Sequence, residues 1–377
     1  DTSITVSSER DIVISNHVVY QDYNTGPPLN ATGYNNMLGI LSWGGKVRIG
    51  ITTPNNLQIH GIVMAPHGIF TADNYQSRPP QGMATLFVDA QPLLKQLPKI
   101  LGAEEEKNYL ILFQNTAERR ATGGFYTFFA VFNINKGKIS IKDSSDIYDL
   151  DNSINVHPAA PEKIAAYHKS VTKFYLRDSN LSPDFVESIK LFDSLYQKSG
   201  RKVKYDGIIA LDSKVLVDML KIFGDTQTSG INFSAETDAH CDCPQVIYKL
   251  FDIVDRPVNY VKVDRKRILG NLMLELFYKA VGFSPSKYWG PMAQAMFDNL
   301  DEKHILLNFT DPATQAAVEK MNYAGQIRQV DSDFLHVNNV NFAGAKSNLF
   351  IDEELISETT FADGGVNRVV KMKFKNP

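Results

Sequence analysis

The chain has 377 residues, of which 43% are hydrophobic and 21% charged, as in ordinary globular proteins, and this length predicts two or three domains. A net charge of −3 argues against general nucleic-acid binding, which requires a basic surface. No apolar run approaches the roughly 18 residues that a transmembrane helix needs, and the first residues lack the charged and then apolar pattern of a signal peptide.

Residues 1–84 predict an all-β domain. Short alternating runs at 11–15, 47–51 and 57–64 are separated by clusters of Gly, Pro and Asn. The segments that carry a further resemblance are 36–41, 47–49, 59–65, 68–70 and 73–75. They resemble the solenoid-like β domains of bacterial pilus-associated surface proteins. The resemblance implies a stack of short strands around one apolar column, and a domain that can self-assemble. Another small β-sandwich is the alternative.

Residues 85–330 predict an α/β layered domain, because strand-like and helix-like apolar patterns alternate along them. Ser182 is the expected N-cap of one helix, with Pro183 at its first position. Expected strands are 109–113, 125–133, 137–141, 206–212 and 304–309. Expected helices are 89–101, 161–175, 183–199, 213–223, 265–281, 291–299 and 311–321. Residues 331–377 predict a C-terminal β segment with strands at 334–341, 349–356 and 366–374.

Established catalytic signatures are absent from the sequence. There is no Gly-x-Ser-x-Gly elbow, no phosphate loop, no His-Glu-x-x-His and no dinucleotide glycine pattern. The two cysteines lie together in the run from His240 to Cys243. Cys241 and Cys243 are compatible with half of a soft-metal site, with a strained local disulfide, or with a surface loop that has no chemistry.

The segment from Glu118 to Phe125 holds the first candidate site. Its paired glycines, Gly123 and Gly124, allow backbone N–H groups to approach a ligand closely, and the adjacent Arg119 and Arg120 supply charge for an anion. A tight turn with solvated arginines is the alternative.

The polar loop 175–185 holds the second candidate site. Arg177 and Asp178 are expected to form either a structural ion pair or an anion clamp with a metal-binding carboxylate. Asn180, Ser182 and Asp184 are more typical of turns and helix caps.

These two segments, with 206–212, 303–308, 325–327 and 343–349, resemble in order and spacing the bacterial domain-of-unknown-function family numbered 4012. The resemblance runs from about residue 88 to the end. It implies an extracytoplasmic location behind an N-terminal anchor. The sequence departs from the family at Ala121, where Pro is common, and at Arg119, where an apolar residue is usual. Arg120 therefore matches the family arginine, and Arg119 is extra.

The element order is also similar to that of LytR-CpsA-Psr domains, whose enzymes transfer lipid-pyrophosphate-linked glycopolymers to the cell wall. The resemblance implies arginines that hold a pyrophosphate, aspartates that hold a divalent cation, and an apolar pocket for a polyisoprenyl tail. It makes Asp143 and Asp178 candidate Mg²⁺ ligands. Lys142 stands where the relatives carry Arg, and Lys lacks the bidentate fork of Arg. The candidate anion ligands are Arg120, Gly123, Gly124, Arg177, Arg265 and Arg267.

The helix expected over 265–281 carries Ile268, Leu272 and Leu276 along one apolar face. In the resembling domains this face borders the polyisoprenyl pocket. A stripe at helical spacing is also what any packed helix shows, and we expect these residues to be ordinary core positions.

Two functional hypotheses follow. The first is a cell-surface structural or adhesive protein whose α/β domain binds an anionic glycan or a lipid head group without catalysis and without a cofactor. The second is a Mg²⁺-dependent transferase that acts on a polyisoprenyl-phosphate-linked cell-wall glycopolymer. Convergence of Arg120, Arg177 and either Arg265 or Arg267 around an apolar tunnel favours the transferase, and separate surfaces favour the first hypothesis.

Overall fold

The computed structural model describes residues 3–10, 12–15, 18, 37–42, 46–49, 62–64, 70–72, 82–167, 170–255, 267–282, 285–331, 334–342, 346–362 and 365–376. The chain divides into two compact units, Asp1–Lys95 and Gln96–Pro377. The division falls inside helix α1 (Gly82–Ile100), which starts earlier than the helix expected over 89–101. The domain boundaries predicted near residues 85 and 331 stay predictions.

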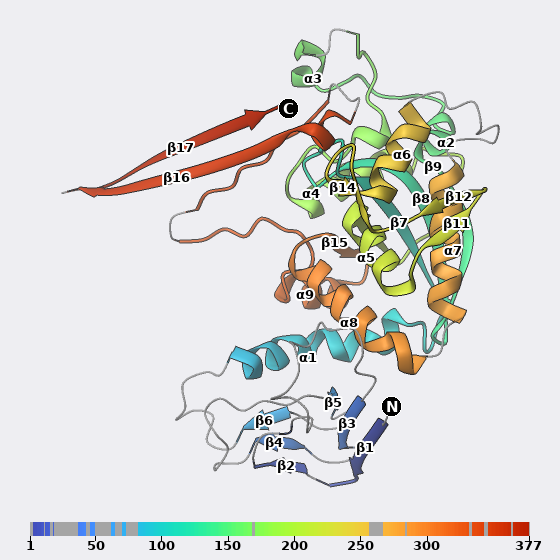
Figure 1. Cartoon of the computed structure of the whole chain (residues 1–377), viewed down its shortest axis with the longest axis vertical. Coiled ribbons are helices and arrows are strands. Elements are labelled where there is room, and N and C mark those ends of the chain that lie inside the picture. The colour runs from blue at the N-terminus through green and yellow to red at the C-terminus, as the bar shows by residue number, and fades with distance from the viewer. Residues whose placement is uncertain are drawn as a thin grey trace. The chain divides into compact units, whose positions relative to one another are not determined.

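The first unit contains six short strands before α1 among its described residues (Figure 1). The odd-numbered strands form one parallel sheet in the order β1-β3-β5, and the even-numbered strands form another in the order β2-β4-β6. Successive strands therefore alternate between two sheets. The bounds are β1 Ser3–Ser8, β2 Ile12–Ile14, β3 Met37–Ser42, β4 Val47–Ile49, β5 Ile62–Met64 and β6 Phe70–Ala72.

The strands expected at 11–15 and 47–51 are found as β2 and β4. Of the run expected at 57–64, residues 62–64 form β5, and residues 57–61 lie outside the described part of the chain. The solenoid and its resemblance to pilus-associated domains stay predictions. Ile14, Ile40 and Val47 are buried, as inward-facing strand positions should be.

The second unit is built on a five-stranded sheet with the order β15-β10-β7-β8-β9. Strands β7 and β10 are parallel, and the other neighbouring pairs are antiparallel. Side chains on both faces of β7 are buried, which explains its continuous apolar run. The bounds are β7 Lys107–Asn115, β8 Phe125–Asn135, β9 Lys138–Asp146, β10 Gly207–Asp212 and β15 Ile305–Phe309.

Helices cover both faces of this sheet (Figure 1). On one face, Leu110 of β7 packs in a core cluster with Leu150 of α2 and Phe192 of α4. On the other face, Phe132 of β8 contacts Phe277 of α7, with ring centroids 5.3 Å apart. The α/β layered architecture is confirmed. The helices are α2 Ile147–Asn152, α3 Glu162–Tyr167, the 3₁₀ helix η2 Leu176–Asp178, α4 Phe185–Tyr196, α5 Ser213–Phe223, α6 Gln245–Asp255, α7 Arg267–Gly282, α8 Pro285–Asp301 and α9 Pro312–Lys320.

Two expected helices differ from those in the structure. The helix expected over 161–175 ends at Tyr167, and Lys173 instead pairs with Ala159 in an isolated bridge. The N-cap of α4 is Asp184 rather than Ser182, since the Asp184 carboxylate accepts a hydrogen bond from the Glu187 N–H.

The apolar face of α7 is ordinary core, as expected. Ile268, Leu272 and Leu276 are buried against α5 and α6. None of the helices in the described part of the chain combines the length and apolar character needed to cross a membrane.

Two small hairpins and a long one complete the second unit. The residues expected to form a strand at 334–341 are not in a strand. The remaining C-terminal strands are found, and β16 and β17 pair in register along 11 residues each. The bounds are β11 Thr226–Thr228, β12 Ile231–Phe233, β13 Thr237–Asp238, β14 Cys243–Pro244, the 3₁₀ helix η3 Ser347–Phe350, β16 Asp352–Ala362 and β17 Gly365–Lys375.

Candidate functional site

The loop between β7 and β8 lies at the carboxyl end of β7, beside the carboxyl end of the parallel strand β10. In open α/β sheets this edge is where ligands bind. The Thr116 N–H donates to Ser213 Oγ at 3.2 Å and ties the loop to the start of α5. The Phe125 N–H donates to the Glu118 carbonyl at 2.9 Å and closes the loop at its base. The first candidate segment therefore lies at the carboxyl edge of the parallel strands.

The paired glycines of this loop have different roles. A Cβ atom on Gly124 would lie 2.4 Å from the Asn115 carbonyl oxygen, so only glycine fits there. Gly123 has a φ of +127°, a conformation that side chains with a Cβ rarely adopt. Gly124 therefore allows close approach to the chain's own backbone, whereas Gly123 borders the pocket described below.

Arg120 is held inside the protein. Its side chain is 3% exposed, and its Nη2 lies 2.9 Å from Glu118 Oε1 and 3.4 Å from Asp178 Oδ1. Nη1 donates to the Asn341 carbonyl. The guanidinium also lies between the rings of Phe125 and Phe342, 5.0 and 4.6 Å from their centroids. This arginine is a buried structural cation, not a solvated turn residue.

Arg177 has a similar environment. Its Nη1 donates to Asp151 Oδ2 at 2.8 Å, and its guanidinium lies 4.5 Å from the ring centroid of Tyr148 and 4.0 Å from that of Tyr175. Its Nε lies 3.9 Å from Asp178 Oδ2. Burial raises the pKa of Asp151, and the neighbouring Arg177 acts in the opposite direction.

Arg120 and Arg177 meet at Asp178, so the structure brings these two predicted arginines together. The resulting arginine network consists of Glu118, Arg120, Asp178, Arg177 and Asp151, in that spatial order. It contains three carboxylates and two guanidiniums. The arginines are therefore already paired with the chain's own acids. The sequence offered the Arg177–Asp178 ion pair as one of two alternatives, but it did not identify Glu118 or Asp151 as partners.

The candidate metal ligands lie in separate ion pairs. Both Asp143 oxygens lie 2.8 Å from Arg201 Nη2, and Asp178 belongs to the arginine network. Lys142 lies 3.5 Å from Glu106. Within the described residues there is no group of three or more His, Cys, Asp or Glu side chains suited to a metal ion. The Mg²⁺ assignment stays a prediction.

The arginines predicted at the start of α7 are not placed by their side chains. Arg265 lies outside the described residues, and of Arg267 only the backbone, as the first residue of α7, is described. Their convergence with Arg120 and Arg177 stays a prediction.

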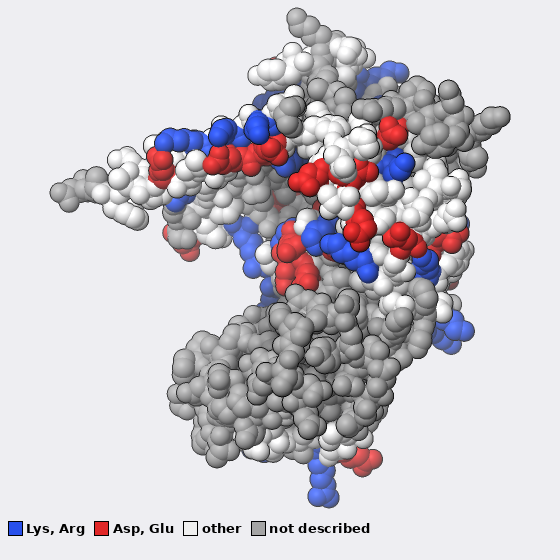
Figure 2. All heavy atoms as spheres, in the orientation of Figure 1, with Lys and Arg blue, Asp and Glu red and all other residues white. Residues whose placement is uncertain are grey.

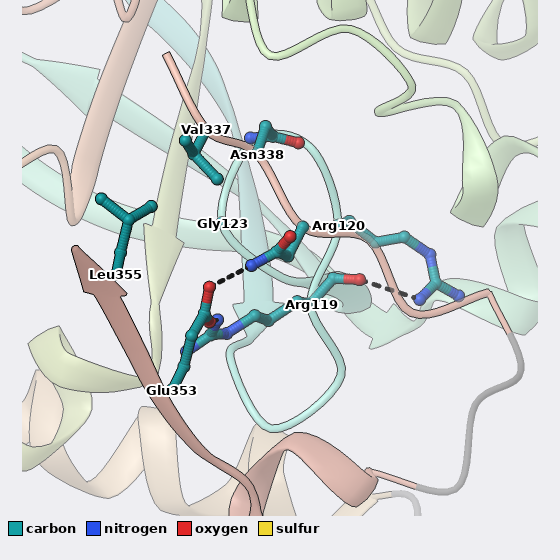
Figure 3. Close-up of a pocket in the computed structure, with 8 residues that line it drawn as sticks. Arg119, Arg120, Gly123, Val337, Asn338, Glu353 and Leu355 are labelled. Atoms are coloured by element: carbon teal, nitrogen blue, oxygen red, sulfur yellow. Dashed lines mark hydrogen bonds and ion pairs between the residues drawn. The ribbon is translucent and has the colours of Figure 1, made fainter. Parts of the chain in front are cut away.

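A polar pocket of about 260 Å³ opens beside the loop (Figure 3). Arg119 and Asn339 both bind the carboxylate of Glu353 at its wall. Arg119, which the family resemblance marks as extra, is therefore a lining residue. The opposite wall includes Asn338 and Asn339, and the Asn-rich run from Asn338 to Asn341 is the sequence feature that could have indicated it. The pocket is lined by Arg119, Arg120, Gly123, Val337, Asn338, Asn339, Glu353 and Leu355.

The C-terminal segment 334–342 is fastened to the loop by backbone and amide hydrogen bonds. The Asn341 N–H donates to the Arg119 carbonyl at 2.9 Å, and Asn338 Nδ2 donates to the Ala121 carbonyl at 2.8 Å. The Arg119 N–H donates to Asn348 Oδ1 at 3.2 Å. The pocket is thus formed by residues more than 200 positions apart.

Residues 104–240 match the model of the family described as "Protein of unknown function (DUF4012)". The matched range includes both arginines of the network, and it is the part of the expected family resemblance that is confirmed. No curated protein matches the chain.

Several solved structures are similar to the chain but distant from it in sequence. Protein gbs0355 from Streptococcus agalactiae is 12% identical, with 61% of this chain and 76% of that one covered and a TM-score of 0.33. TagV from B. subtilis is 12% identical, with 64% and 94% covered and a TM-score of 0.28. A transcriptional regulator from Enterococcus faecalis is 12% identical, with 71% and 83% covered and a TM-score of 0.27.

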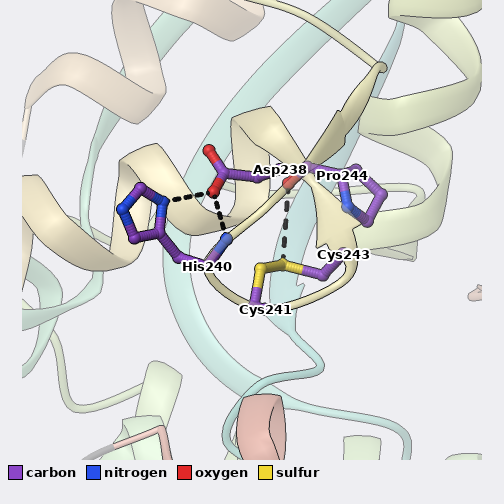
Figure 4. Close-up of a disulfide and its surroundings, with 5 residues drawn as sticks. All are labelled: Asp238, His240, Cys241, Cys243 and Pro244. Atoms are coloured by element: carbon purple, nitrogen blue, oxygen red, sulfur yellow. Dashed lines mark hydrogen bonds and ion pairs between the residues drawn. A yellow bond between two sulfur atoms is a disulfide. The ribbon is translucent and has the colours of Figure 1, made fainter.

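The two cysteines form a disulfide that joins Cys241, in the loop after β13, to Cys243, the first residue of β14 (Figure 4). Of the three alternatives considered for Cys241 and Cys243, the local disulfide is therefore the one found, and neither sulfur is a free thiolate for a metal. His240 Nδ1 lies 2.7 Å from Asp238 Oδ1, and the His240 ring stacks on Tyr248 at 4.7 Å.

Proposed function

We propose that the second unit is a non-catalytic binding module of an extracytoplasmic bacterial surface protein, with its ligand in the pocket beside Arg119. The observation that carries the proposal is that both arginines of the network are already paired with carboxylates of the chain. Arg120 and Arg177 are paired with carboxylates inside the protein, whereas Arg119, which is paired with Glu353, keeps 39% of its side chain exposed at the pocket. Arg119 is therefore the arginine of this loop that a ligand reaches without breaking buried ion pairs.

The lining of the pocket favours a glycan. Asn338 and Asn339 offer amide groups, and Arg119 with Glu353 offers a donor and an acceptor for hydroxyl groups. Leu355 adds an apolar wall of the kind that packs on the CH faces of a sugar ring. A cell-wall glycopolymer, neutral or carrying an anionic group, fits this chemistry.

The disulfide supports an extracytoplasmic location. Disulfides form and persist in oxidising compartments and are rare in reducing ones. Cys241 and Cys243, the chain's two cysteines, are joined in this way. The family resemblance implies the same compartment.

For the first unit we propose a display role. Its strands alternate between two parallel sheets, as expected for coils stacked along one axis. A stack of this kind would hold the binding module away from the cell surface. Self-assembly through the first unit is also part of the proposal.

A transferase is the second candidate, and one observation favours it. Arg120 and Arg177 converge on Asp178 at the carboxyl edge of the sheet, where phosphoryl chemistry would need them. In this function Asp178 and Asp143 would bind Mg²⁺, and a polyisoprenyl-linked pyrophosphate would displace the carboxylates from the arginines. Breaking the ion pairs of the arginine network would cost free energy that ligand binding beside Arg119 does not require.

Calorimetric titration of the full chain with solubilised cell-wall glycopolymer tests the proposal. We expect Arg119→Ala and Asn338→Ala to weaken binding at least about tenfold, which corresponds to about 1.4 kcal/mol. Lys190→Ala, an exposed change on α4, is the control and should bind as the unmodified chain does. Unchanged binding by Arg119→Ala would reject the pocket as the site.

The same protein, given Mg²⁺, a polyisoprenyl-pyrophosphate-linked glycan and cell-wall material as the acceptor of the glycan phosphate, separates the two functions. Release of polyisoprenyl phosphate that is lost in Asp178→Asn would support the transferase. Binding without turnover would support the binding module.

A further inference from the structure

The pocket beside Arg119 keeps hydrogen-bonding groups of both kinds available to a ligand. Arg119 Nη1 and Asn339 Nδ2 both donate to the Glu353 carboxylate. Asn338 Nδ2 donates to the Ala121 carbonyl at 2.8 Å. Within the described residues, Arg119 Nε and Nη2 donate to no acceptor, and the amide oxygens of Asn338 and Asn339 accept from no donor. The guanidinium can therefore donate to a ligand carbonyl, and either amide can accept from a ligand N–H.

Two apolar side chains complete the lining. Val337 and Leu355 both border the pocket, and Figure 3 shows them together on one side of it. Leu355 is 42% exposed, so part of its surface is open to a ligand. An apolar surface next to free hydrogen-bonding groups stabilises a ligand that carries a methyl group beside a polar one.

The charges at the pocket disfavour an anionic ligand group. Arg119 is paired with Glu353 at the wall, and Arg120, the other cation of the lining, is paired with Glu118 and Asp178 inside the protein. A phosphate or carboxylate that approached Arg119 would lie beside the Glu353 carboxylate, which repels it. An uncharged group meets no such repulsion.

The hairpin that contributes Leu355 carries mixed charge. Glu358 lies 2.8 Å from Lys371, and Glu354 lies 3.4 Å from Lys373. Figure 2 shows these acidic and basic side chains in adjacent rows along β16 and β17. The surface next to the pocket is therefore not a basic track of the kind that attracts a polyanion.

We propose that the pocket binds the acetamido group of an N-acetylated amino sugar, an inference that rests on the proposed glycan-binding function. The acetamido carbonyl oxygen accepts from Arg119, and the acetamido N–H donates to the amide oxygen of Asn338 or Asn339. The methyl group contacts Val337 and Leu355. A hydroxyl group in the same place leaves the apolar wall without a contact. An ammonium group is repelled by the Arg119 cation and offers it no acceptor.

The volume of the pocket suits a single sugar unit. Its roughly 260 Å³ lies just below the range of about 300–1,000 Å³ that is usual for pockets that enclose drug-sized ligands. One N-acetylated unit of a polymer would therefore enter the pocket, and the neighbouring units would lie outside it.

Three trisaccharides that differ only in the group on carbon 2 test the inference on the full chain. Triacetylchitotriose carries acetamido groups, cellotriose carries hydroxyl groups, and the trimer of glucosamine carries ammonium groups. In calorimetric titrations we expect the dissociation constant of triacetylchitotriose to be at least about tenfold below those of the other two. A site that pairs its polar groups with a particular substituent discriminates against analogues that leave those groups unpaired.

Two valines of the same segment provide matched variants. Val337 lines the pocket, whereas Val340, which is 40% exposed, is not among the lining residues. Val337→Ser should reduce the preference for triacetylchitotriose over cellotriose at least about threefold, because it removes apolar surface from the methyl group. Val340→Ser should leave the preference unchanged. Because both changes lie in one segment, a general loosening of that segment would affect the two variants alike.

The outcomes separate this inference from the function on which it rests. Similar affinities for the three trisaccharides, tighter binding of cellotriose or of the glucosamine trimer, or equal effects of the two serine changes would overturn the acetamido assignment. Binding of cell-wall glycopolymer without binding of triacetylchitotriose would overturn it as well, and in each of these cases the proposed glycan-binding function would stand. If neither the glycopolymer nor any trisaccharide bound, the proposed function would be rejected together with this inference.

Discussion

Each arginine of the network is held between two aromatic rings and at least one carboxylate. The rings remove water from the guanidinium, and the carboxylates compensate for the lost hydration. Removal of the carboxylates around such a cation destabilises the fold strongly, because water does not solvate the charge that remains. The network therefore predicts large effects from changes that look conservative in the sequence.

Arg120→Ala should lower the free energy of unfolding by about 3–5 kcal/mol, since it leaves Glu118 and Asp178 without their shared cation. Arg119→Ala, one residue earlier, removes a side chain that is 39% exposed and should cost about 0–1 kcal/mol. Urea denaturation of both variants measures the difference. Equal losses would show that the buried pairs do not dominate the stability of the loop.

The burial of Asp151 predicts the sign of one contribution to the pH dependence of the protein's stability. Burial raises its pKa above the ordinary 3.8, so the native state holds the proton more tightly than the unfolded chain does. Its contribution to stability is complete below 3.8 and is lost as the pH rises through the native pKa. We expect the stability of the unmodified chain, relative to Asp151→Asn, to fall as pH is raised from about 3.

The measurement is the free energy of unfolding of both proteins across a pH series. A relative stability that rises with pH would mean that attraction to Arg177 outweighs the burial of the carboxylate. The pKa of Asp151 in the native state would then lie below its ordinary value rather than above it.

The residues of the network were only partly predictable. Arg120, Arg177 and Asp178 stand in motifs and could be chosen from the sequence. Asp151 lies 26 residues before Arg177, and Asn341 lies 221 residues after Arg120. Contacts between such distant residues depend on tertiary packing, and a local sequence pattern does not predict them.

At the level of elements, the β7–β8 loop depends on one close backbone approach. Gly124→Ala would place a Cβ within 2.9 Å of three backbone atoms, which cannot move as a side chain can. We expect a loss of at least about 2 kcal/mol. Gly137→Ala, in the turn between β8 and β9, has a φ of +76° but no atom within 4 Å, and it should cost about 1 kcal/mol.

Thermal unfolding of the two glycine variants separates packing from backbone strain. A Gly137 variant as unstable as the Gly124 variant would show that the close approach at Gly124 costs no more than the left-handed backbone at Gly137.

Elements with a strong apolar period were predicted well, and elements defined by tertiary contacts were not. Strands β7, β8, β10 and β15 follow from their apolar runs. The predicted helix 161–175 fails after Tyr167, because Lys173 forms a bridge and the Phe174 N–H donates to the Pro158 carbonyl. Helix α6 has Val246 and Ile253 in the core at helical spacing, a pattern that was present but not used.

At the level of the whole molecule, the two compact units predict separate responses to core mutations. Ile40 is buried in the first unit and Leu110 in the second. Ile40→Ala and Leu110→Ala should each lower the stability of their own unit by about 2–5 kcal/mol and leave the other unit unaffected. Scanning calorimetry should show one shifted transition in each variant. A joint shift of the whole profile would mean that the units unfold together.

The bonds that fasten the C-terminal segment to the β7–β8 loop have a consequence for biosynthesis. During translation the loop emerges more than 200 residues before Asn341, whose carbonyl and N–H complete it. Until then Arg120 also lacks the ring of Phe342. The α/β core can collapse early around its sheet, but the loop closes only after Asn341 and Phe342 have been made. A chain terminated before Asn341 would therefore carry a loop that lacks these contacts.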